Sequence, residues 1–186
     1  MENLLEWSRS QTGTLKWRPD YIDLKNAIHG NLVLLRSNAE NKNIQLSATY
    51  FSGIDGEKKP EIVYVDRNMV STVIRNLLSN ALKFTGSGGK VSISTHNKGD
   101  FIEIAVSDTG VGIKEEDREK LFRLDVHHTT LGTNEEKGTG LGLLLCKEFV
   151  EKNRGSISVE SEIGKGSTFR FILPKKKEEK EEKEKK

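Results

Sequence analysis

The segment Asn76–Thr85 constrains this chain more than any other, because it places polar groups on one face of an otherwise apolar helix. Asn76, Asn80 and Lys83 are spaced four and then three residues apart, so they lie along one stripe. The other face is predicted to enter a core through Val70, Val73, Ile74, Leu77, Ala81 and Phe84. A carboxamide oxygen suits a magnesium ion and an ammonium group suits a phosphate. The pattern therefore predicts a nucleotide-binding helix.

Two glycine-rich segments extend this prediction. Asp108–Ile113 follows residues 101–107, whose alternation predicts a half-buried strand, so a carboxylate lies at a strand end before a turn. Gly138–Leu143 leads into an apolar helical run through Val150. Glycines let backbone N–H groups approach phosphate oxygens closely, and a helix start adds a favourable dipole.

These three segments, in this order, resemble the N, G1 and G2 boxes of the sensor histidine kinase catalytic domain, within the gyrase, Hsp90, histidine kinase and MutL ATPase superfamily. The resemblance covers roughly Trp17 to Pro174. It implies a Bergerat-type α/β two-layer sandwich, in which helices cover one face of a mixed, mostly antiparallel sheet. It also implies ATP and Mg²⁺ as cofactors.

The resemblance assigns roles to individual residues. Asn80 would ligate magnesium, Asn76 would support the metal and phosphates, and Lys83 would contact phosphate, which makes these three the catalytic set. Asp108 would accept from the adenine amino group, a role that suits an acceptor-only carboxylate. The remaining expected nucleotide contacts are Gly110, Gly112, Lys137, Gly138, Thr139, Gly140, Leu141, Gly142 and Thr168.

Charge and cysteine content narrow the function classes. The 186 residues carry a net charge of +2, and the tail Lys175–Lys186, with seven lysines and five glutamates, accounts for all of it. The balanced body argues against nucleic-acid binding. Cys146 is the single cysteine, so no internal disulfide exists, and its apolar surroundings predict a packed thiol. Without a long apolar run or a signal-peptide pattern, we expect no membrane contact by this chain and a cytoplasmic location, either by itself or as the cytoplasmic part of a membrane-anchored sensor.

Three regions are predicted along the chain: the end of a dimerisation-hairpin helix with its linker (1–13), the catalytic domain (14–174) and a charged tail expected to be disordered or a solvated helix (175–186). Asp23 and Asp66 are placed to cap helices. One or two short charged helices are expected within Glu115–Leu124, and a lid over the nucleotide at Asp125–Lys137. An edge strand is expected at Thr14–Trp17, and two further strands, Ile44–Tyr50 and Glu61–Val65, are expected to flank a Gly53–Gly56 turn. Two hairpins are expected as well, Val91–Thr95 with Phe101–Val106 and Ser156–Val159 with Thr168–Leu173.

Several residues keep two readings. Arg123 and Lys137 could reach the phosphates or be solvated charges, and the adjacent His127 and His128 lack a third metal ligand. Phe122 matches the family's F box, but Leu124, Asp125 and Val126 replace its second aromatic residue. His29 and His96 lack the Glu and Arg neighbours of the family's phosphoacceptor motif, so the acceptor histidine is absent from this chain.

The favoured function is transfer of the ATP γ-phosphoryl group to a histidine on a dimerisation domain outside this chain. The resemblance implies a homodimer of the full protein and a response-regulator receiver as the next partner. A water-activating ATPase of the same superfamily is the alternative, but Asn76 occupies the position of the glutamate that activates water there. A nucleotide-binding module without catalysis and a serine kinase of the anti-sigma type are further alternatives.

Overall fold

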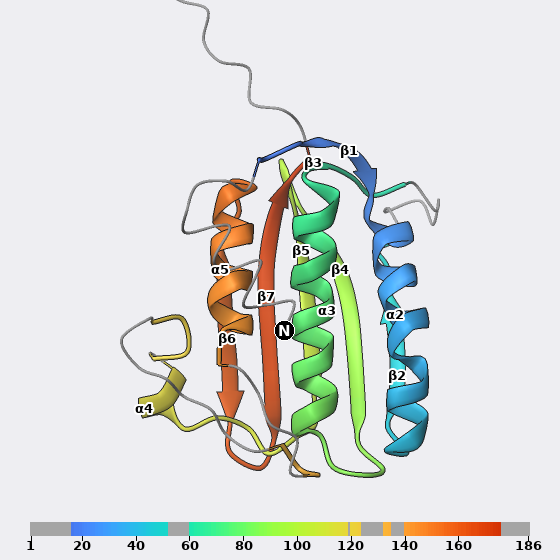
Figure 1. Ribbon diagram of the computed structural model, residues 1–186, viewed down its shortest axis with the longest axis vertical. Helices are drawn as coiled ribbons and strands as arrows, with labels where there is room; N and C mark the ends of the chain where they lie inside the picture. Colours follow the sequence, from blue (N-terminus) through green and yellow to red (C-terminus); the bar gives the residue numbers. More distant parts are fainter. Residues whose placement is uncertain (1–15, 52–59, 119, 124–131, 135–139, 176–186) are drawn as a thin grey trace, which may run out of the picture.

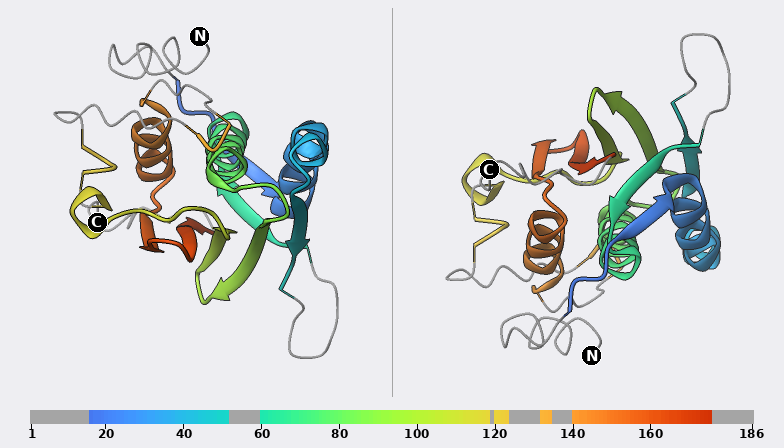
Figure 2. Two further views of the ribbon diagram at one scale, coloured as in Figure 1. Left: turned by 90° about the horizontal axis from the view of Figure 1, so that it is seen from below. Right: turned by 90° about the horizontal axis from the view of Figure 1, so that it is seen from above.

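The computed structural model describes residues 16–51, 60–118, 120–123, 132–134 and 140–175. Three long helices lie over one face of a five-stranded sheet, and the two layers separate clearly when the molecule is viewed end-on (Figure 2). The helices are α2 (Leu24–Asn41), α3 (Arg67–Phe84) and α5 (Gly142–Lys152). The strands, in their order across the sheet, are β2 (Gln45–Thr49), β4 (Lys90–Lys98), β5 (Phe101–Asp108), β7 (Gly166–Pro174) and β6 (Ile157–Glu162).

The sheet is mixed, since β2 runs parallel to β4 and the other three neighbouring pairs are antiparallel. Both predicted hairpins are confirmed, β4 with β5 and β6 with β7. Alternate residues of these strands enter the core between the layers, as in Ile102, Ile104 and Val106 of β5. The predicted two-layer architecture is therefore confirmed.

A separate two-stranded sheet closes one end of the sandwich, at the top of Figure 1. It pairs β1 (Asp20–Asp23) with β3 (Ile62–Val65) in antiparallel register. The prediction of a strand at Thr14–Trp17 is wrong for Lys16 and Trp17, because pairing begins only after Pro19. Trp17 instead donates its indole N–H to Asn153 Oδ1 at 3.1 Å.

The strands expected around a Gly53–Gly56 turn exist, but they do not pair with each other. β2 pairs with β4, and β3 pairs with β1. Residues 53–56 lie outside the described part of the chain, so the turn itself stays a prediction.

Both predicted helix caps are confirmed. Asp23 accepts from the Lys25 backbone N–H at 2.9 Å at the start of α2. Asp66 accepts from the backbone N–H groups of Asn68 and Met69 at 3.0 and 3.2 Å at the start of α3. Such a cap stabilises a helix by about 1 kcal/mol.

Five of the six apolar residues predicted for the core face of α3 are buried. Phe84 is the exception, because it is half-buried and the Lys83 ammonium lies 4.8 Å from the centre of its ring. The short helix expected within Glu115–Leu124 is α4 (Glu115–Arg118), a single turn. No helix in the described part of the chain is long and apolar enough to cross a membrane.

The chain directions bring three predicted motifs to the same end of the sandwich. The C-terminal ends of α3 and β5 lie at the lower end in Figure 1, and the N-terminal end of α5 is directed toward that end. The opposite ends of α3 and α5 are tied together, since Asn153 Oδ1 accepts from the Asp66 backbone N–H at 2.7 Å.

Candidate nucleotide-binding site

Asp108 is the last residue of β5, and the backbone holds one of its carboxylate oxygens in place. Oδ1 accepts from the Gly110 N–H at 2.8 Å and from the Ser167 N–H at 3.3 Å. Burial raises the pKa of Asp108, and these two backbone N–H groups act in the opposite direction. Within the described residues no donor reaches Oδ2. The second oxygen is therefore available to accept from a ligand.

The loop that follows Asp108 fits tightly between two neighbours, and glycine is required at both contacts. A Cβ on Gly110 would lie 2.3 Å from the Phe84 carbonyl oxygen at the end of α3. Gly112 has φ +72°, and a Cβ there would lie 2.1 Å from the carbonyl oxygen of Glu162, the last residue of β6. Close backbone packing therefore requires Gly110 and Gly112, and any contact with a nucleotide base would be an additional role.

The polar stripe of α3 leads toward Asp108. Asn80 and Lys83 are half-buried, whereas Asn76 is buried with 8% of its surface exposed. The Cys146 thiol of α5 donates to the Val73 carbonyl oxygen of α3, with 3.8 Å between sulfur and oxygen. Burial raises the pKa of Cys146 to about 12, and the nearby Asn76 side chain lowers it by less. The packed thiol predicted for Cys146 is confirmed.

Two residues that the sequence did not point to hold the C-terminal end of α3. The Lys42 ammonium donates to the carbonyl oxygens of Leu82 and Lys83 at 2.9 and 3.2 Å, which places a cation at the negative end of the helix. The Thr133 backbone N–H and hydroxyl both bond the Lys83 carbonyl oxygen at 3.0 Å. The described part of the predicted lid is therefore fastened beside the candidate phosphate contacts.

The start of α5 has the form of an anion site. Gly140 has φ +71°, Leu141 is the buried N-cap residue, and no described side chain caps this helix end. The first backbone N–H groups of a helix, together with its dipole, attract phosphate. Gly140, Leu141 and Gly142 are placed to offer them, while Lys137, Gly138 and Thr139 lie outside the described residues.

Thr168 and Asp108 line the same pocket, but Thr168 is not the residue opposite Asp108 in the sheet. In the β5–β7 ladder Thr168 stands opposite Ser107, and their hydroxyl oxygens are 3.0 Å apart on the face away from the helices. Ser167 is the residue opposite Asp108, and it shares the buried face of Phe169 and Phe171. The period-two alternation of those phenylalanines is the sequence signal that could have identified Ser167.

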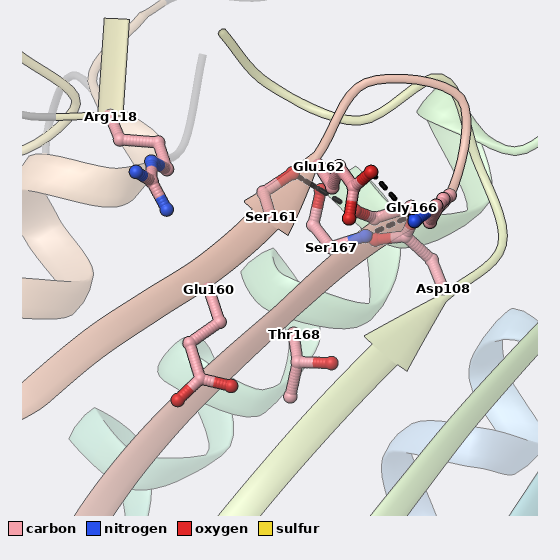
Figure 3. Close-up of a pocket in the computed structure, with 9 residues that line it drawn as sticks. Asp108, Arg118, Glu160, Ser161, Glu162, Gly166, Ser167 and Thr168 are labelled. Carbon is pink, nitrogen blue, oxygen red and sulfur yellow. Dashed lines mark hydrogen bonds and ion pairs between the residues drawn. The ribbon is translucent and has the colours of Figure 1, made fainter. Parts of the chain in front are cut away.

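A pocket of about 330 Å³ opens at the end of the β6–β7 hairpin beside Asp108 (Figure 3). Two of its acids are neutralised by ion pairs, Glu160 with Arg170 and Glu162 with Lys165, each at 2.7 Å. The remaining acid, Asp108, is held by backbone N–H groups. The lining residues are Asp108, Arg118, Glu160, Ser161, Glu162, Lys165, Gly166, Ser167 and Thr168.

The donor set fits a magnesium ion that arrives with a triphosphate rather than a resident metal. In the described part of the chain no three His, Cys, Asp or Glu side chains gather to hold a metal. Magnesium commonly keeps several waters and takes one or two protein oxygens plus substrate phosphates. The carboxamide oxygen of Asn80, half-buried near the end of α3, suits that kind of coordination.

Comparison with known proteins identifies the family. Residues 65–177, which include α3, Asp108 and α5, match the family described as "Histidine kinase-, DNA gyrase B-, and HSP90-like ATPase". The chain belongs to this ATPase family. The resemblance seen in the sequence is confirmed, and nucleotide use follows from membership.

Individual relatives give the same result. The chain is similar to the histidine protein kinase DivJ of Caulobacter vibrioides, 34% identical over 176 residues that cover 94% of this chain and 28% of DivJ. Its fold matches the catalytic domain of histidine kinase ThkA at a TM-score of 0.71 and 28% identity, covering 85% of this chain and 96% of that domain. A structure of ThkA in complex with the response regulator protein TrrA matches at a TM-score of 0.70 and 23% identity, over 93% of this chain and 47% of that one. This ATPase-family chain therefore corresponds to a catalytic domain and spans about a quarter of the length of DivJ.

Proposed function

We propose that this chain is the ATP-binding catalytic domain of a sensor histidine kinase, which transfers the γ-phosphoryl group to a histidine of a dimerisation domain. The observation that carries the proposal is the meeting of three kinds of group at one end of the sandwich: the carboxylate of Asp108, the polar stripe of α3 and the start of α5. Each suits a different part of ATP.

The base end is assigned to Asp108. Its Oδ2 accepts from the exocyclic amino group of adenine. A purine with a carbonyl at that position would place a second acceptor against Oδ2, so no hydrogen bond could form. The adjacent glycine turn brings the loop backbone close to the base.

The phosphate end is assigned to Asn80, Lys83 and the start of α5. Asn80 offers its carboxamide oxygen to magnesium and Lys83 its ammonium group to phosphate, while Gly140, Leu141 and Gly142 offer backbone N–H groups. Magnesium, when bound, neutralises developing charge on the transferred phosphoryl group. Gly138, Thr139 and Lys137 are proposed to extend this set.

Catalysis is proposed to consist of positioning and charge neutralisation, because helix α3, which carries the proposed phosphate contacts, contains no acidic residue that could act as a general base. Asn76 stands where a water-activating ATPase needs a glutamate, and a carboxamide takes no proton at neutral pH. Its side chain is also buried against Cys146 on α5. These facts favour an imidazole as the attacking group, since a neutral histidine needs no base to react.

The partners are proposed from the relatives. The attacking histidine belongs to a dimerisation hairpin in a homodimer of the longer protein, and the receiver of a response regulator takes the phosphoryl group next, as the complex of ThkA with TrrA suggests. Phosphoryl transfer is proposed to take place in the cytoplasm. His29 and His96 are exposed, and His96 lies toward the end of β4 that is remote from Val91, the residue paired with Asp108.

The test is phosphotransfer in trans. The 186-residue chain is mixed with a dimerisation domain of a related kinase and γ-labelled ATP with Mg²⁺, and label on the supplied histidine is measured. We expect transfer that falls at least about 100-fold in Asn80→Ala, because its metal ligand is lost. The matched control, Asn41→Ala, removes an exposed carboxamide at the end of α2 and should keep full transfer. Rapid ATP hydrolysis without an acceptor would support the ATPase alternative, and ATP binding without transfer would support a binding module.

A further inference from the structure

The hydroxyl group of Ser161 is a junction between the β6–β7 hairpin and the loop after Asp108. Ser161 is the fifth residue of β6 and is half-buried. Its Oγ is 2.8 Å from the Ile113 backbone nitrogen, 2.9 Å from the Gly166 carbonyl oxygen and 2.9 Å from Ser167 Oγ. Figure 3 shows Ser161, Gly166 and Ser167 gathered beside Asp108, with Arg118 apart from them on α4.

The donors and acceptors in this group fix the direction of each hydrogen bond. A serine hydroxyl has one proton and two lone pairs. The Ile113 N–H can only donate and the Gly166 carbonyl can only accept. Ser161 therefore gives its proton to Gly166 and accepts from Ile113, and its second lone pair accepts the proton of Ser167. All three contacts are satisfied together, and the Ser167 proton is committed to Ser161.

The same group reaches the carboxylate of Asp108 through the backbone. Ser167, which is bonded to Ser161 through its hydroxyl, donates its N–H to Asp108 Oδ1 at 3.3 Å. At the far end of the loop, Ile113 is held by Ser161, and Val111 accepts from the Gly164 N–H at 2.9 Å. The hairpin thus holds the loop at Asp108, Val111 and Ile113.

We propose that Ser161 is a positioning residue for base recognition, which fastens the loop 108–113 to the β6–β7 hairpin and so fixes the direction in which Asp108 Oδ2 points. This inference rests on the proposed function, because it concerns the same adenine contact. Ser161 itself touches neither base nor phosphate in this scheme. Its hydroxyl acts through Ser167 and Ile113.

The consequence is selective for the base. When Ser161 loses its hydroxyl, the Ile113 N–H, the Gly166 carbonyl and the Ser167 hydroxyl each lose a partner, and the loop is no longer held at its far end. A site built to bond an amino group discriminates strongly only while its acceptor is well placed. The phosphate contacts on α3 and α5 belong to other elements, so they should be unaffected.

The test measures the affinities of ATP and of inosine triphosphate (ITP), whose base carries a carbonyl in place of the amino group. We expect wild-type chain with Mg²⁺ to prefer ATP. In Ser161→Ala we expect ATP binding to weaken about tenfold, which corresponds to one lost hydrogen bond of ordinary strength, with less than about a twofold change for ITP. Ser161→Thr keeps the hydroxyl and should restore the wild-type ATP-to-ITP ratio. Ser158→Ala, on the exposed face of the same strand, is the matched control and should leave both affinities unchanged.

The outcomes separate the two proposals. An unchanged ATP-to-ITP ratio in Ser161→Ala, or an equal loss for both nucleotides, would overturn the role of Ser161 and leave the proposed function intact. A wild-type chain that binds neither nucleotide would overturn the proposed function itself. If Ser161→Ala does not fold, as judged by its thermal transition, Ser161→Cys provides a milder loss of hydrogen bonding in the same shape, and the same comparison of ratios decides.

Discussion

Replacement of Asp108 by asparagine should reverse the base preference of the site, because the backbone dictates how the new amide is oriented. The N–H groups of Gly110 and Ser167 both point at Oδ1, at 2.8 and 3.3 Å. Only the amide oxygen can accept from them, so the NH₂ group must take the place of Oδ2. The atom that faces the base then changes from an acceptor to a donor.

The size of the effect follows from the bond that is lost. A hydrogen bond to a charged acceptor contributes about 1.5–3 kcal/mol, so ATP should bind roughly 10- to 100-fold more weakly to Asp108→Asn. ITP presents a carbonyl to the new donor, and its affinity should stay the same or rise. The fold should not suffer, because the substitution removes a charge from a position where burial disfavours it.

Calorimetric titration of both nucleotides in the presence of Mg²⁺ measures this directly. Asp100→Asn, an exposed carboxylate in the turn between β4 and β5, is the matched control and should change neither affinity. Equal weakening of ATP and ITP in Asp108→Asn would show that Asp108 shapes the loop without reading the base. An unchanged ATP affinity would place the base elsewhere.

Three further predictions concern the framework around the site. Gly110→Ala places a Cβ 2.3 Å from the Phe84 carbonyl oxygen and should lower the free energy of unfolding by about 1–3 kcal/mol. The control Gly86→Ala adds its Cβ in open space and should leave the denaturant midpoint nearly unchanged. Equal midpoints for the two variants would refute the close packing at Gly110. Because burial raises the pKa of Asp108, its contribution to stability is present below its ordinary pKa of 3.8 and is lost as the pH rises through the raised value. The difference in unfolding free energy between wild type and Asp108→Asn should therefore vary with pH over that acidic range. A difference that stays constant with pH would contradict the raised pKa. Cys146, with a pKa of about 12 and full burial, should react with iodoacetamide at neutral pH only as fast as the chain unfolds, and rapid labelling of native protein would be inconsistent with its packing.

The elements with strong local signals could be predicted from the sequence. Asp66 and the apolar period that follows it define α3, and alternation in residues 101–107 defines β5, because one side of each element must be buried. The order of the glycine segments then indicated a nucleotide site at the ends of these elements. Membership of the ATPase family confirms nucleotide use, and the position of the site stays a prediction.

Long-range pairings were harder to predict. The four residues of β1 carry no clear alternation, and their partner β3 lies about forty residues further along the chain, so nothing local indicated the strand. The contacts of Lys42 and Thr133 with the end of α3 join residues far apart in sequence and involve residue types that are common on surfaces. Ser161 and Ser167 could not be predicted from a motif, and only the period-two alternation of β7 places Ser167 on the buried face.

The measurement that tests the central claim most directly is a crystal structure of this chain with Mg²⁺ and a non-hydrolysable ATP analogue. We predict that the adenine amino group lies within hydrogen-bond distance of Asp108 Oδ2, that the Asn80 carboxamide oxygen ligates the metal, and that the phosphates face Lys83 and the start of α5. A nucleotide bound with its base away from Asp108, or a metal held without Asn80, would contradict the account.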